Sequence, residues 1–401
     1  MEFTKSQQPE EVTVKHIILE ANESDAIVFD VDDLMTYLNQ LTDTRDRRGK
    51  VYPLGLVLTL VVLAKLAGED RPSGIAEWIH LRRDALVALF KCKHQRMPCL
   101  NSIRWILQEI VSAQELERAL TRYLHETYGG QESQLVAIDG KTMRGTIPKG
   151  SHQGVHLLAA YLPAEGVVLK QVEVGAKENE ISAAPEVIKG LNLKNKVVCG
   201  DAIHTQRGLS IDILARGGHY IWFLKDNQPT ALADAEQFFQ PPQKSAGWPL
   251  PEQPRTMAQT TGKKHGRLEQ RTLTLVVDEV GYLEWPGARQ VFKLERQAHH
   301  MRTGTKSNQQ VIGLTSCDPE MASAEQLLEW TRHYWGIENG LHYRRDVTLR
   351  EDATRISQPT LARAIAAINN FLIGLSQKLG YSNLASARRI FNARIAAQLP
   401  R

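Results

Sequence analysis

The order of apolar segments between residues 134 and 226 constrains the fold more than any other feature of this sequence. LVAID (135–139), VHLLAAYLP (155–163) and GVVLKQVEVG (166–175) are short apolar runs separated by turn residues, which predicts three consecutive strands. A helix, a strand, a helix and a strand are then predicted in SAAPEVIKGLNL, KVVCGDA, GLSIDILARGG and HYIWFLKD. This order is typical of a mixed α/β layer that begins with a hairpin meander.

The segments on either side of this layer have different patterns of apolar residues. Residues 28–127 carry apolar residues at three- and four-residue spacing, which predicts helices throughout. Such a stretch is compatible with a DNA-binding or assembly domain and equally with a plain helix bundle. Residues 241–318 contain alternating runs such as RTLTLVVDEV and predict a β-rich insertion. From residue 319 onward the pattern returns to helices.

The longest apolar run, residues 51–64, is too short to cross a membrane. It contains Pro53 and Gly55 and is followed by Lys65, whereas a membrane span needs roughly 20 apolar residues. We therefore expect a buried helix. The N-terminus lacks the pattern of a signal peptide, and the four cysteines show neither zinc-site nor redox spacing. These features predict a cytoplasmic protein without a membrane segment.

The net charge of +4 does not by itself indicate a nucleic-acid partner. Basic residues nevertheless cluster along the chain, at 45–50, 91–96, 263–267, 344–345 and 388–389. Clusters of this kind track the phosphates of nucleic acids, and they also occur on solvated loops and helix faces. Charge alone leaves both interpretations open.

Two aspartates each end an apolar strand, Asp139 in LVAID and Asp201 in VVCGD. A carboxylate just past the C-terminal end of a strand lies at the rim of the sheet, where α/β proteins usually place their chemistry. On adjacent strands, two such carboxylates come within reach of one cation, and Mg²⁺ prefers carboxylates combined with water and phosphate oxygens. Aspartate at a strand end also serves as a turn or cap residue, so the pair is compatible with either role.

A third acid, Glu338, lies in a predicted late helix. At about 100° per residue, Tyr334, Glu338, His342 and Arg345 fall on one stripe of that helix. Such a stripe could bind a metal ion and a phosphate together, or it could be an ion-pair ladder on a solvated surface.

Several short motifs follow one another along the chain. They are Asp139-Gly140-Lys141, Lys177-Glu178-Asn179-Glu180-Ile181, Gly200-Asp201-Ala202, Lys225-Asp226-Asn227-Gln228-Pro229, His265-Gly266-Arg267 and Trp335-Gly336-Ile337-Glu338-Asn339. Together with LTDTRDRRGKVYPL near the N-terminus, they resemble the H-repeat-associated group of DDE transposases from bacterial insertion sequences. The resemblance covers nearly the whole chain.

This resemblance implies an α/β fold: an RNase H-like mixed sheet flanked by helices, with a β-rich insertion and an N-terminal all-helical domain. The domains would be an N-terminal helical domain (1–127), the first part of the catalytic core (128–240), the insertion (241–318) and the C-terminal helices of the core (319–401). The interval between Asp201 and Glu338 is about twice that between Asp139 and Asp201. It is therefore long enough to hold the insertion.

The resemblance also assigns roles. Asp139, Asp201 and Glu338 would be the catalytic and metal-binding residues. Predicted DNA contacts are Lys225, Asn227 and Gln228 beside the active site and His265 and Arg267 on the insertion, and the residues expected to orient phosphate are Lys141, Arg144, His342 and Arg345. The sequence departs from the broader superfamily around the third acid, where Thr331 and Tyr334 stand in the tyrosine and arginine positions and Arg345 in the lysine position. Asp346, Glu351 and Asp352 therefore remain alternative third acids.

The implied function is a DNA transposase that cuts the ends of an insertion sequence and joins the freed 3′-hydroxyl to target DNA. It would use two Mg²⁺ ions, with Mn²⁺ as a substitute. Its partners would be DNA and further copies of the chain, as a homodimer or a higher assembly, in the cytoplasm and on the nucleoid. Alternatives are an inactive, domesticated transposase that only binds DNA and a structure-selective nuclease of the same fold. A small-molecule phosphohydrolase would leave the helical domain and the basic clusters without a use.

Overall fold

The computed structural model describes residues 16–21, 25–93, 95–129, 133–175, 177–240, 254–264 and 266–399. They form two compact units, which we call the helical unit (1–129 and 347–401) and the α/β unit (130–346). The segment 319–401, which the sequence predicts as one part of the core, is divided between the two units.

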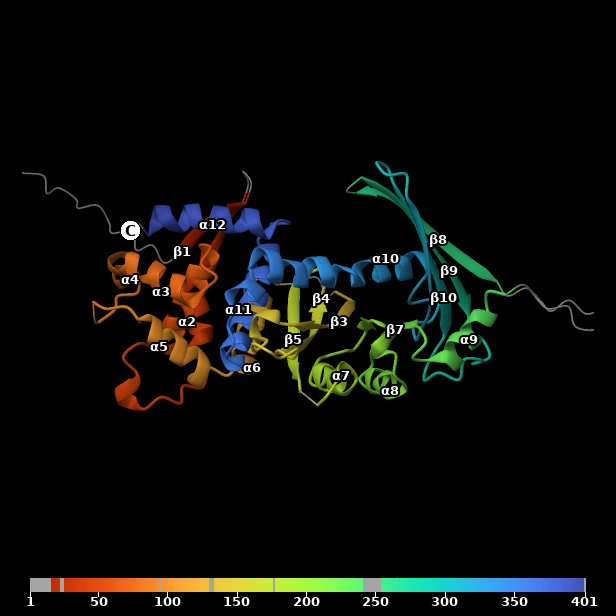
Figure 1. Ribbon diagram of the computed structural model, residues 1–401, viewed down its shortest axis with the longest axis horizontal. Coiled ribbons are helices and arrows are strands. Elements are labelled where there is room, and N and C mark those ends of the chain that lie inside the picture. Colours follow the sequence, from red (N-terminus) through yellow and green to blue (C-terminus); the bar gives the residue numbers. More distant parts are fainter. Residues whose placement is uncertain are drawn as a thin grey trace, which may run out of the picture. The chain divides into compact units, whose positions relative to one another are not determined.

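The helical unit consists of helices preceded by a two-stranded hairpin that the sequence does not predict (Figure 1). The predicted N-terminal helical region is confirmed, and the hairpin is an addition to it. Its elements are β1 (His16–Ala21), β2 (Asp25–Asp30), α1 (Val31–Leu38), η1 (Arg47–Gly49), α2 (Leu54–Leu66), α3 (Pro72–Leu81), α4 (Arg83–Leu89), α5 (Leu100–Trp105), η2 (Ile106–Ile110), α6 (Ala113–Tyr128), η7 (Glu351–Thr354), α11 (Pro359–Lys378) and α12 (Leu384–Gln398).

Helix α2 is the centre of the helical unit, and each of its residues is buried. A helix that is apolar on all sides must be enclosed by other elements, and α1, α3, α11 and α12 contact it. The stretch Arg47–Leu66 is long and apolar enough to cross a membrane by composition, but 72% of that window is buried inside the protein. The prediction of a buried core helix is confirmed.

Lys65 near the end of α2 is a buried cation that requires a local partner. Its ammonium lies 3.7 Å from Asp70 Oδ1. Arg388 donates to the same oxygen at 2.8 Å and to the Lys65 carbonyl at 3.1 Å. Burial lowers the pKa of Lys65 to about 8, against the attraction of Asp70. Removal of one member would leave a buried charge without compensation, so this cluster ties α12 to α2.

The α/β unit follows the predicted order of elements. They are β3 (Leu135–Thr142), η3 (Arg144–Thr146), β4 (His156–Leu162), β5 (Val167–Val174), α7 (Glu180–Ile188), β6 (Val197–Gly200), η4 (Ala202–His204), α8 (Arg207–Ala215), β7 (His219–Leu224), α9 (Pro229–Gln237), β8 (Arg255–Lys264), β9 (Arg267–Val277), β10 (Gln290–His300), β11 (Lys306–Thr315), α10 (Ala324–Tyr334), η5 (Glu338–His342) and η6 (Arg344–Thr348).

One nine-stranded sheet runs through this unit in the order β5-β4-β3-β6-β7-β11-β10-β9-β8. Strands β3, β6 and β7 are parallel neighbours, and the other pairs are antiparallel. Helices α7 and α8 cover one face of the first five strands and α10 lies on the other (Figure 1). This is the mixed, helix-flanked sheet of an RNase H-like fold, as the sequence predicts.

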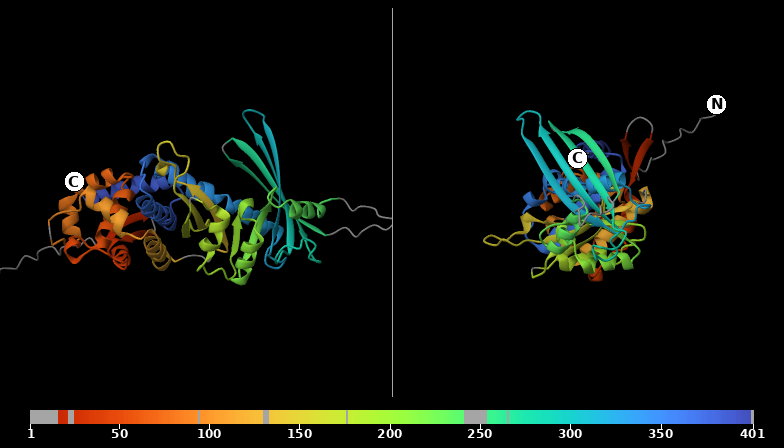
Figure 2. Two further views of the ribbon diagram at one scale, coloured as in Figure 1. Left: turned by 60° about the horizontal axis from the view of Figure 1, so that its bottom comes forward. Right: turned by 90° about the vertical axis from the view of Figure 1, so that its right-hand side faces the viewer.

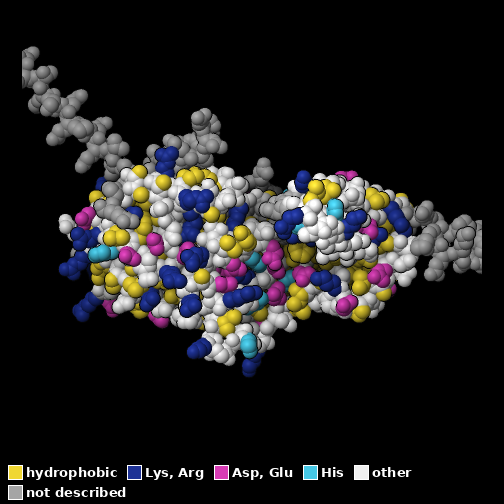
Figure 3. All heavy atoms as spheres, turned by 45° about the horizontal axis from the view of Figure 1, so that its top comes forward, with side chains coloured by type: hydrophobic (Ala, Val, Ile, Leu, Met, Phe, Trp, Pro, Cys, Tyr) yellow, Lys and Arg dark blue, Asp and Glu magenta, His cyan; other side chains and the backbone are white. Residues whose placement is uncertain are grey.

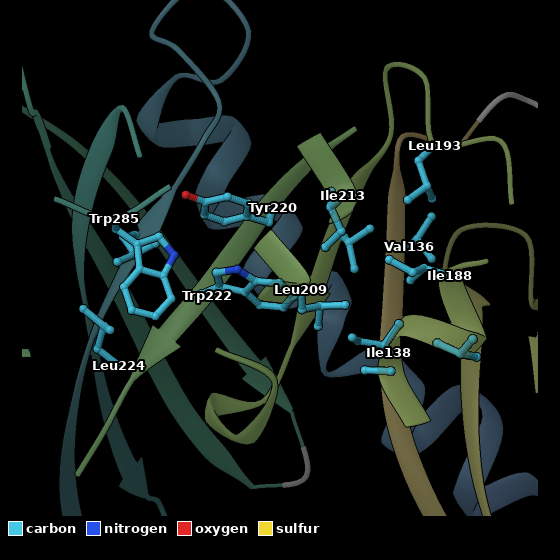
Figure 4. Close-up of a cluster of buried hydrophobic side chains, with 14 of the residues drawn as sticks. Val136, Ile138, Ile188, Leu193, Leu209, Ile213, Tyr220, Trp222, Leu224 and Trp285 are labelled. Carbon is cyan, nitrogen blue, oxygen red and sulfur yellow. The ribbon is translucent and has the colours of Figure 1, made fainter. Parts of the chain in front are cut away.

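The main core fills the space between the sheet and helices α7, α8 and α9. Alternate residues of the parallel strands, such as Val136, Ile138 and Trp222, point into it (Figure 4). The indoles of Trp222 and Trp285 both donate to the hydroxyl of Ser210, at 2.9 and 3.1 Å, which satisfies two buried donors at one point. Because one face of each strand is committed to this core, the intervening residues, including Asp139, belong to the face covered by α10.

The β-rich insertion extends the same sheet, because β11 pairs with β7. Two of its strands, β9 and β11, are exposed at one end and buried at the other: β11 is exposed along Lys306–Gln310 and buried from Ile312 to Thr315. Figure 2 shows these long strands running beyond the helices that cover the rest of the sheet. The insertion therefore has an anchored base and a projecting ribbon.

Candidate active site

Two strands in register place the two aspartates. Ile138 of β3 is paired with Gly200 of β6 in a parallel ladder, so Asp139 and Asp201 are the next residues on neighbouring strands, whose spacing is about 4.8 Å. Gly200 allows this arrangement, because a Cβ there would lie 2.8 Å from Ile138 and 2.9 Å from the His204 ring. The predicted meeting of two strand-terminal carboxylates is therefore present in the fold.

Asp139 is largely enclosed by other acids. Its side chain is 23% exposed, and His342 Nδ1 lies 3.6 Å from its Oδ2. Burial raises its pKa to about 7, and the carboxylates of Glu180, Glu338 and Asp201 add to the effect. A cation bound beside these carboxylates would offset their repulsion and favour the ionised form of Asp139.

Asp201 has a more open position and partners of its own. Its Oδ1 accepts from the Ala202 amide at 2.7 Å, which caps η4, and lies 3.2 Å from the Lys225 ammonium. Its side chain is 48% exposed. The Oδ1 atom therefore accepts from both the Ala202 amide and Lys225.

Glu180, for which the sequence indicates no catalytic role, stands beside Asp139 with two histidines. Its carboxylate is 2.9 Å from His156 Nε2 and 3.2 Å from His204 Nε2. Burial acts to raise its pKa, but the two imidazoles outweigh this and lower it to about 2. Gly140 is required here, since a Cβ would come 2.2 Å from the Glu180 carboxylate. Glu180 is thus a fixed negative charge behind Asp139.

Two features of the sequence could have located Glu180. It lies in the Lys177–Ile181 motif, and Asn179 before it forms a capping box with Ser182 at the start of α7. Neither feature shows that α7 begins beside the end of β3. That proximity arises only from the packing of α7 on β4 and β5.

The predicted third acid, Glu338, lies on a π-turn and not on the continuous α-helix that the sequence predicts. Helix α10 ends at Tyr334, and η5 spans Glu338–His342 with the wider π pattern. The predicted stripe is therefore interrupted: Glu338 is exposed, while His342 and Arg345 are buried. Glu338 still acts on Asp139, since its charge contributes to the raised pKa of that carboxyl. Single π-turns occur frequently at functional sites.

The alternative third acids have other partners or another location. Asp346 lies 2.5 Å from the buried ammonium of Lys141, which is two residues after Asp139 on β3. Glu351 is buried in the helical unit and accepts from Asn369 at 2.8 Å. Asp352 belongs to the same unit. Glu338 is the one whose charge affects Asp139.

His342 is held neutral next to the acids. Burial lowers its pKa to about 3, and the charges of Arg345 and Lys141 lower it further. Its Nε2 is buried with no hydrogen-bond partner in the described part of the chain. A neutral imidazole with an unused nitrogen at this position is suited to contact a bound group.

The predicted DNA-binding residues occupy varied positions. Lys225 is exposed beside Asp201, whereas the amides of Asn227 and Gln228 donate to the carbonyls of Ala202 and Thr205, at 2.7 and 2.9 Å, and so brace the loop after Asp201. Arg144 is exposed just beyond β3, and Arg267 is exposed at the start of β9. His265 lies outside the described residues. Figure 3 shows acidic side chains and histidines gathered together on one face, with Lys and Arg around them.

The sequence matches the family model described as "Transposase DDE domain" over residues 130–373 and the associated domain model over residues 35–124. The chain belongs to the DDE transposase family. A protein of Escherichia coli O157:H7 named "Putative transposase YncI" is 28% identical over 86% of this chain and 87% of its own. "H repeat-associated putative transposase YhhI" of E. coli K12 is 24% identical over 85% and 89%. The predicted resemblance is confirmed.

DDE transposase domains generally use divalent metal ions, and the residues at this site fit such an ion. The donors are carboxylate oxygens, and the pKa of Asp139 is raised first by its burial and then by the charges of Glu180, Glu338 and Asp201. As placed, no three Asp, Glu, His or Cys residues of the described chain are close enough to enclose a metal alone.

Proposed function

We propose that this transposase cuts one DNA strand at each end of an insertion sequence and joins the freed 3′-hydroxyl to target DNA. The observation that supports this most is the placement of Asp139 and Asp201 after register-paired residues of two parallel strands. In the first step, water attacks the phosphorus, the bond to the 3′-oxygen breaks, and that oxygen leaves as a hydroxyl. In the second, the oxygen of this hydroxyl bonds to the phosphorus of a target phosphodiester, the bond from that phosphorus to the target's own 3′-oxygen breaks, and that oxygen leaves as a hydroxyl.

Asp139, Asp201 and Glu338 would hold two Mg²⁺ ions, with Mn²⁺ as a substitute. When bound, such ions help to deprotonate the attacking oxygen and neutralise the leaving one. The protein contributes position and charge, because phosphoryl transfer needs little covalent help. Asp139, with its pKa near 7, must release its proton to act as a ligand. Glu180 remains ionised behind it and keeps the site negative.

Basic groups at the rim would hold the phosphates of the substrate. Lys225 lies 3.2 Å from Asp201 and is exposed, so it can turn to a phosphate once a cation occupies the acids. Lys141 is fixed by Asp346, and Arg144, His342 and Arg345 complete the predicted set. Asn227 and Gln228 would act beside DNA through the loop that they brace. On the projecting ribbon, Arg267 and His265 are the predicted contacts. A homodimer or higher assembly would pair the two element ends.

The test is cleavage of a labelled duplex that carries the element ends with their flanks, in Mg²⁺. We expect the parent protein to nick at the element end and, with pre-cut ends, to join them to a target plasmid. Asp201→Asn should do neither, whereas Asp212→Asn, an acid on α8 outside the site, should do both. Nicking without joining would indicate a nuclease. Binding without either reaction, the same for all three proteins, would indicate an inactive DNA-binding relative and overturn the proposal.

A further inference from the structure

The helical unit contains a pocket of about 730 Å³ that none of the predicted sites includes. It lies where the start of α3, the exposed side of α5 and the turn before α11 come together. Its lining is mainly polar, with four apolar residues among those that line it. The lining residues are Arg71, Pro72, Ser73, Arg104, Gln108, Ala353, Thr354, Arg355, Ile356, Ser357, Gln358 and Leu361.

Three arginines give this pocket its character. Arg71, Arg104 and Arg355 are all exposed, and their guanidinium groups form no hydrogen bond or ion pair with any residue in the described part of the chain. None of the described lining residues is Asp or Glu. By contrast, Arg45 and Arg388 of the same unit are bound to Asp43 and Asp70. The three pocket arginines are therefore available to an external anion.

The backbone around the pocket favours the same sign of ligand. Helix α3, ten residues long, begins at Pro72, and the cap residue before it, Arg71, makes no side-chain hydrogen bond to the first turn. Helix α11, twenty residues long, begins at Pro359 on the same wall. Free amides and the positive end of the helix dipole attract anions. The uncapped start of α3 therefore adds to the charge of the arginines, whereas at the start of α11 the Gln358 side chain already accepts from the Leu361 amide.

Arg355 is held in a conformation that non-glycine residues seldom adopt. Its φ is 52°, and Arg350, five residues earlier, has a φ of 51°. Left-handed backbone at arginine is unfavourable and persists where the surrounding structure imposes it, often at ligand-binding segments. The turn from residue 350 to residue 355 thus presents Arg355 to the pocket at a cost in backbone energy.

A neighbouring depression marks the boundary of the basic site. It is lined by Glu69, Asp70 and Glu77 and shares Arg71, Ser73, Ala353 and Thr354 with the pocket. Arg71 therefore lies between the arginines of the pocket and the acidic residues of the depression. An extended anion would be attracted on one side of Arg71 and repelled on the other, which favours a defined path along the pocket.

We propose that this pocket binds phosphates of the DNA backbone, as an anchoring site in the helical unit. Arginine forks match the geometry of phosphate oxygens, and the hydroxyls of Ser73 and Ser357 supply further donors. Because the three guanidinium groups are exposed, they could each bind one of several successive phosphates of one strand. The proposal rests on the proposed function only in its choice of DNA, and its test does not depend on catalysis.

The test measures equilibrium binding of a fluorescent duplex of arbitrary sequence to the full chain, without metal, from low to moderate salt. The triple variant Arg71→Gln/Arg104→Gln/Arg355→Gln is compared with Arg83→Gln/Arg118→Gln/Arg389→Gln, which removes three exposed arginines of the same unit outside the pocket. Each phosphate contact contributes about one unit to the slope of log affinity against log salt. We expect the pocket variant to lose two to three units of slope and at least tenfold in affinity at low salt.

A lysine version of the pocket variant keeps the charges, and we expect it to retain most of the slope and to bind more tightly than the glutamine version. Thermal melting establishes that each variant is folded, and Arg104→Gln alone, on the exposed side of α5, serves if the triple variant does not fold. Equal losses in the pocket and control variants would overturn the proposal. So would binding of inorganic pyrophosphate at the pocket with unchanged affinity for the duplex. Because no cutting is measured, a failure of the proposed chemistry would leave this result intact.

Discussion

The two units of this protein collect charge of opposite sign, and they do so with different structural elements. In the α/β unit, burial of Asp139 raises its pKa to about 7, and the charges of Glu180, Glu338 and Asp201 add to this effect. The helical unit lines a pocket with three arginines and no acid among its described residues. The acids follow paired strands, whose spacing is fixed by the ladder. Arg71 lies at the start of α3, Arg104 on the exposed side of α5 and Arg355 in a turn, so the three arginines come from separate elements.

This difference indicates a division of work. Chemistry at phosphorus requires ligands held at a defined separation, and the register of β3 against β6 supplies it. Retention of DNA requires several positive groups that tolerate variation in position. The predictions below test whether the acid cluster and the arginine pocket have these separate roles.

The largest effect is expected for the third acid. Glu338→Gln should lower the rate of Mg²⁺-dependent nicking by at least about 10³-fold, because removal of a metal ligand removes most of the charge stabilisation. Its affinity for DNA without metal should stay within about twofold, since the arginine pocket is untouched. Nicking is followed on a labelled duplex under saturating protein.

The matched comparison is Asp346→Asn, which removes the partner of Lys141 and should lower the rate by only about tenfold, as expected for a positioning residue. If Asp346→Asn is the more damaging of the two, Asp346 is the third acid and the assignment of Glu338 is wrong.

The second effect concerns pH and the metal ion. Since the pKa of Asp139 is raised to about 7, the carboxyl is protonated below that pH and must lose its proton to bind Mg²⁺. The Mg²⁺ concentration for half-maximal nicking should therefore rise about tenfold per unit as pH falls from 7 to 5, and should level off above 7. DNA binding at the arginines should show no such dependence. A flat Mg²⁺ requirement between pH 5 and 8 would contradict the assignment.

The third effect isolates the fixed charge of Glu180. Glu180→Gln removes a negative group that raises the pKa of Asp139, so the rise in Mg²⁺ requirement should begin at a lower pH. The rate of nicking at a fixed, subsaturating Mg²⁺ concentration above pH 7 should fall by a few fold, because the site loses part of its attraction for cations. Glu186→Gln, an exposed acid on the same helix, is the control. A loss of rate without a shift of the pH profile would indicate a purely structural role.

The smallest effect is expected for Lys225. Its ion pair with Asp201 is exposed on both sides, so Lys225→Gln should change the free energy of unfolding by less than about 1 kcal/mol. The Michaelis constant for DNA should nevertheless rise by a few fold while kcat changes less. Chemical denaturation and steady-state nicking measure the two quantities. A stability loss well above 1 kcal/mol would show that Lys225 mainly supports the fold.

Much of the fold follows from the sequence because its periodicities are local. The strands at 135–142, 156–162 and 197–200, and the buried helix α2, are each identified by their own apolar pattern. Asp139 and Asp201 could be paired because parallel strand ends meet at one edge. The resemblance to the family motifs supplied Glu338 as the predicted third acid of the site.

The remaining features depend on contacts between distant segments. The pairing of β11 with β7, which places the insertion in the same sheet, has no signal in either strand alone. The π-turn at Glu338–His342 could not be expected from a pattern that fits an ordinary helix. Glu180 and its two histidines meet through the packing of α7. The arginine pocket joins residues 71, 104 and 355, which are remote in sequence.

The central claim is tested most directly by measuring binding and cutting together on one labelled duplex for three proteins: the parent, Asp201→Asn and the pocket triple variant. We predict that Asp201→Asn binds with the affinity of the parent and does not nick at any protein concentration. The pocket variant should bind at least tenfold more weakly and nick at close to the parental rate once the protein is in excess. If the pocket variant nicks no faster at saturation than Asp201→Asn, or if Asp201→Asn loses binding as strongly as cutting, the two charged sites do not have separate roles and the account is wrong.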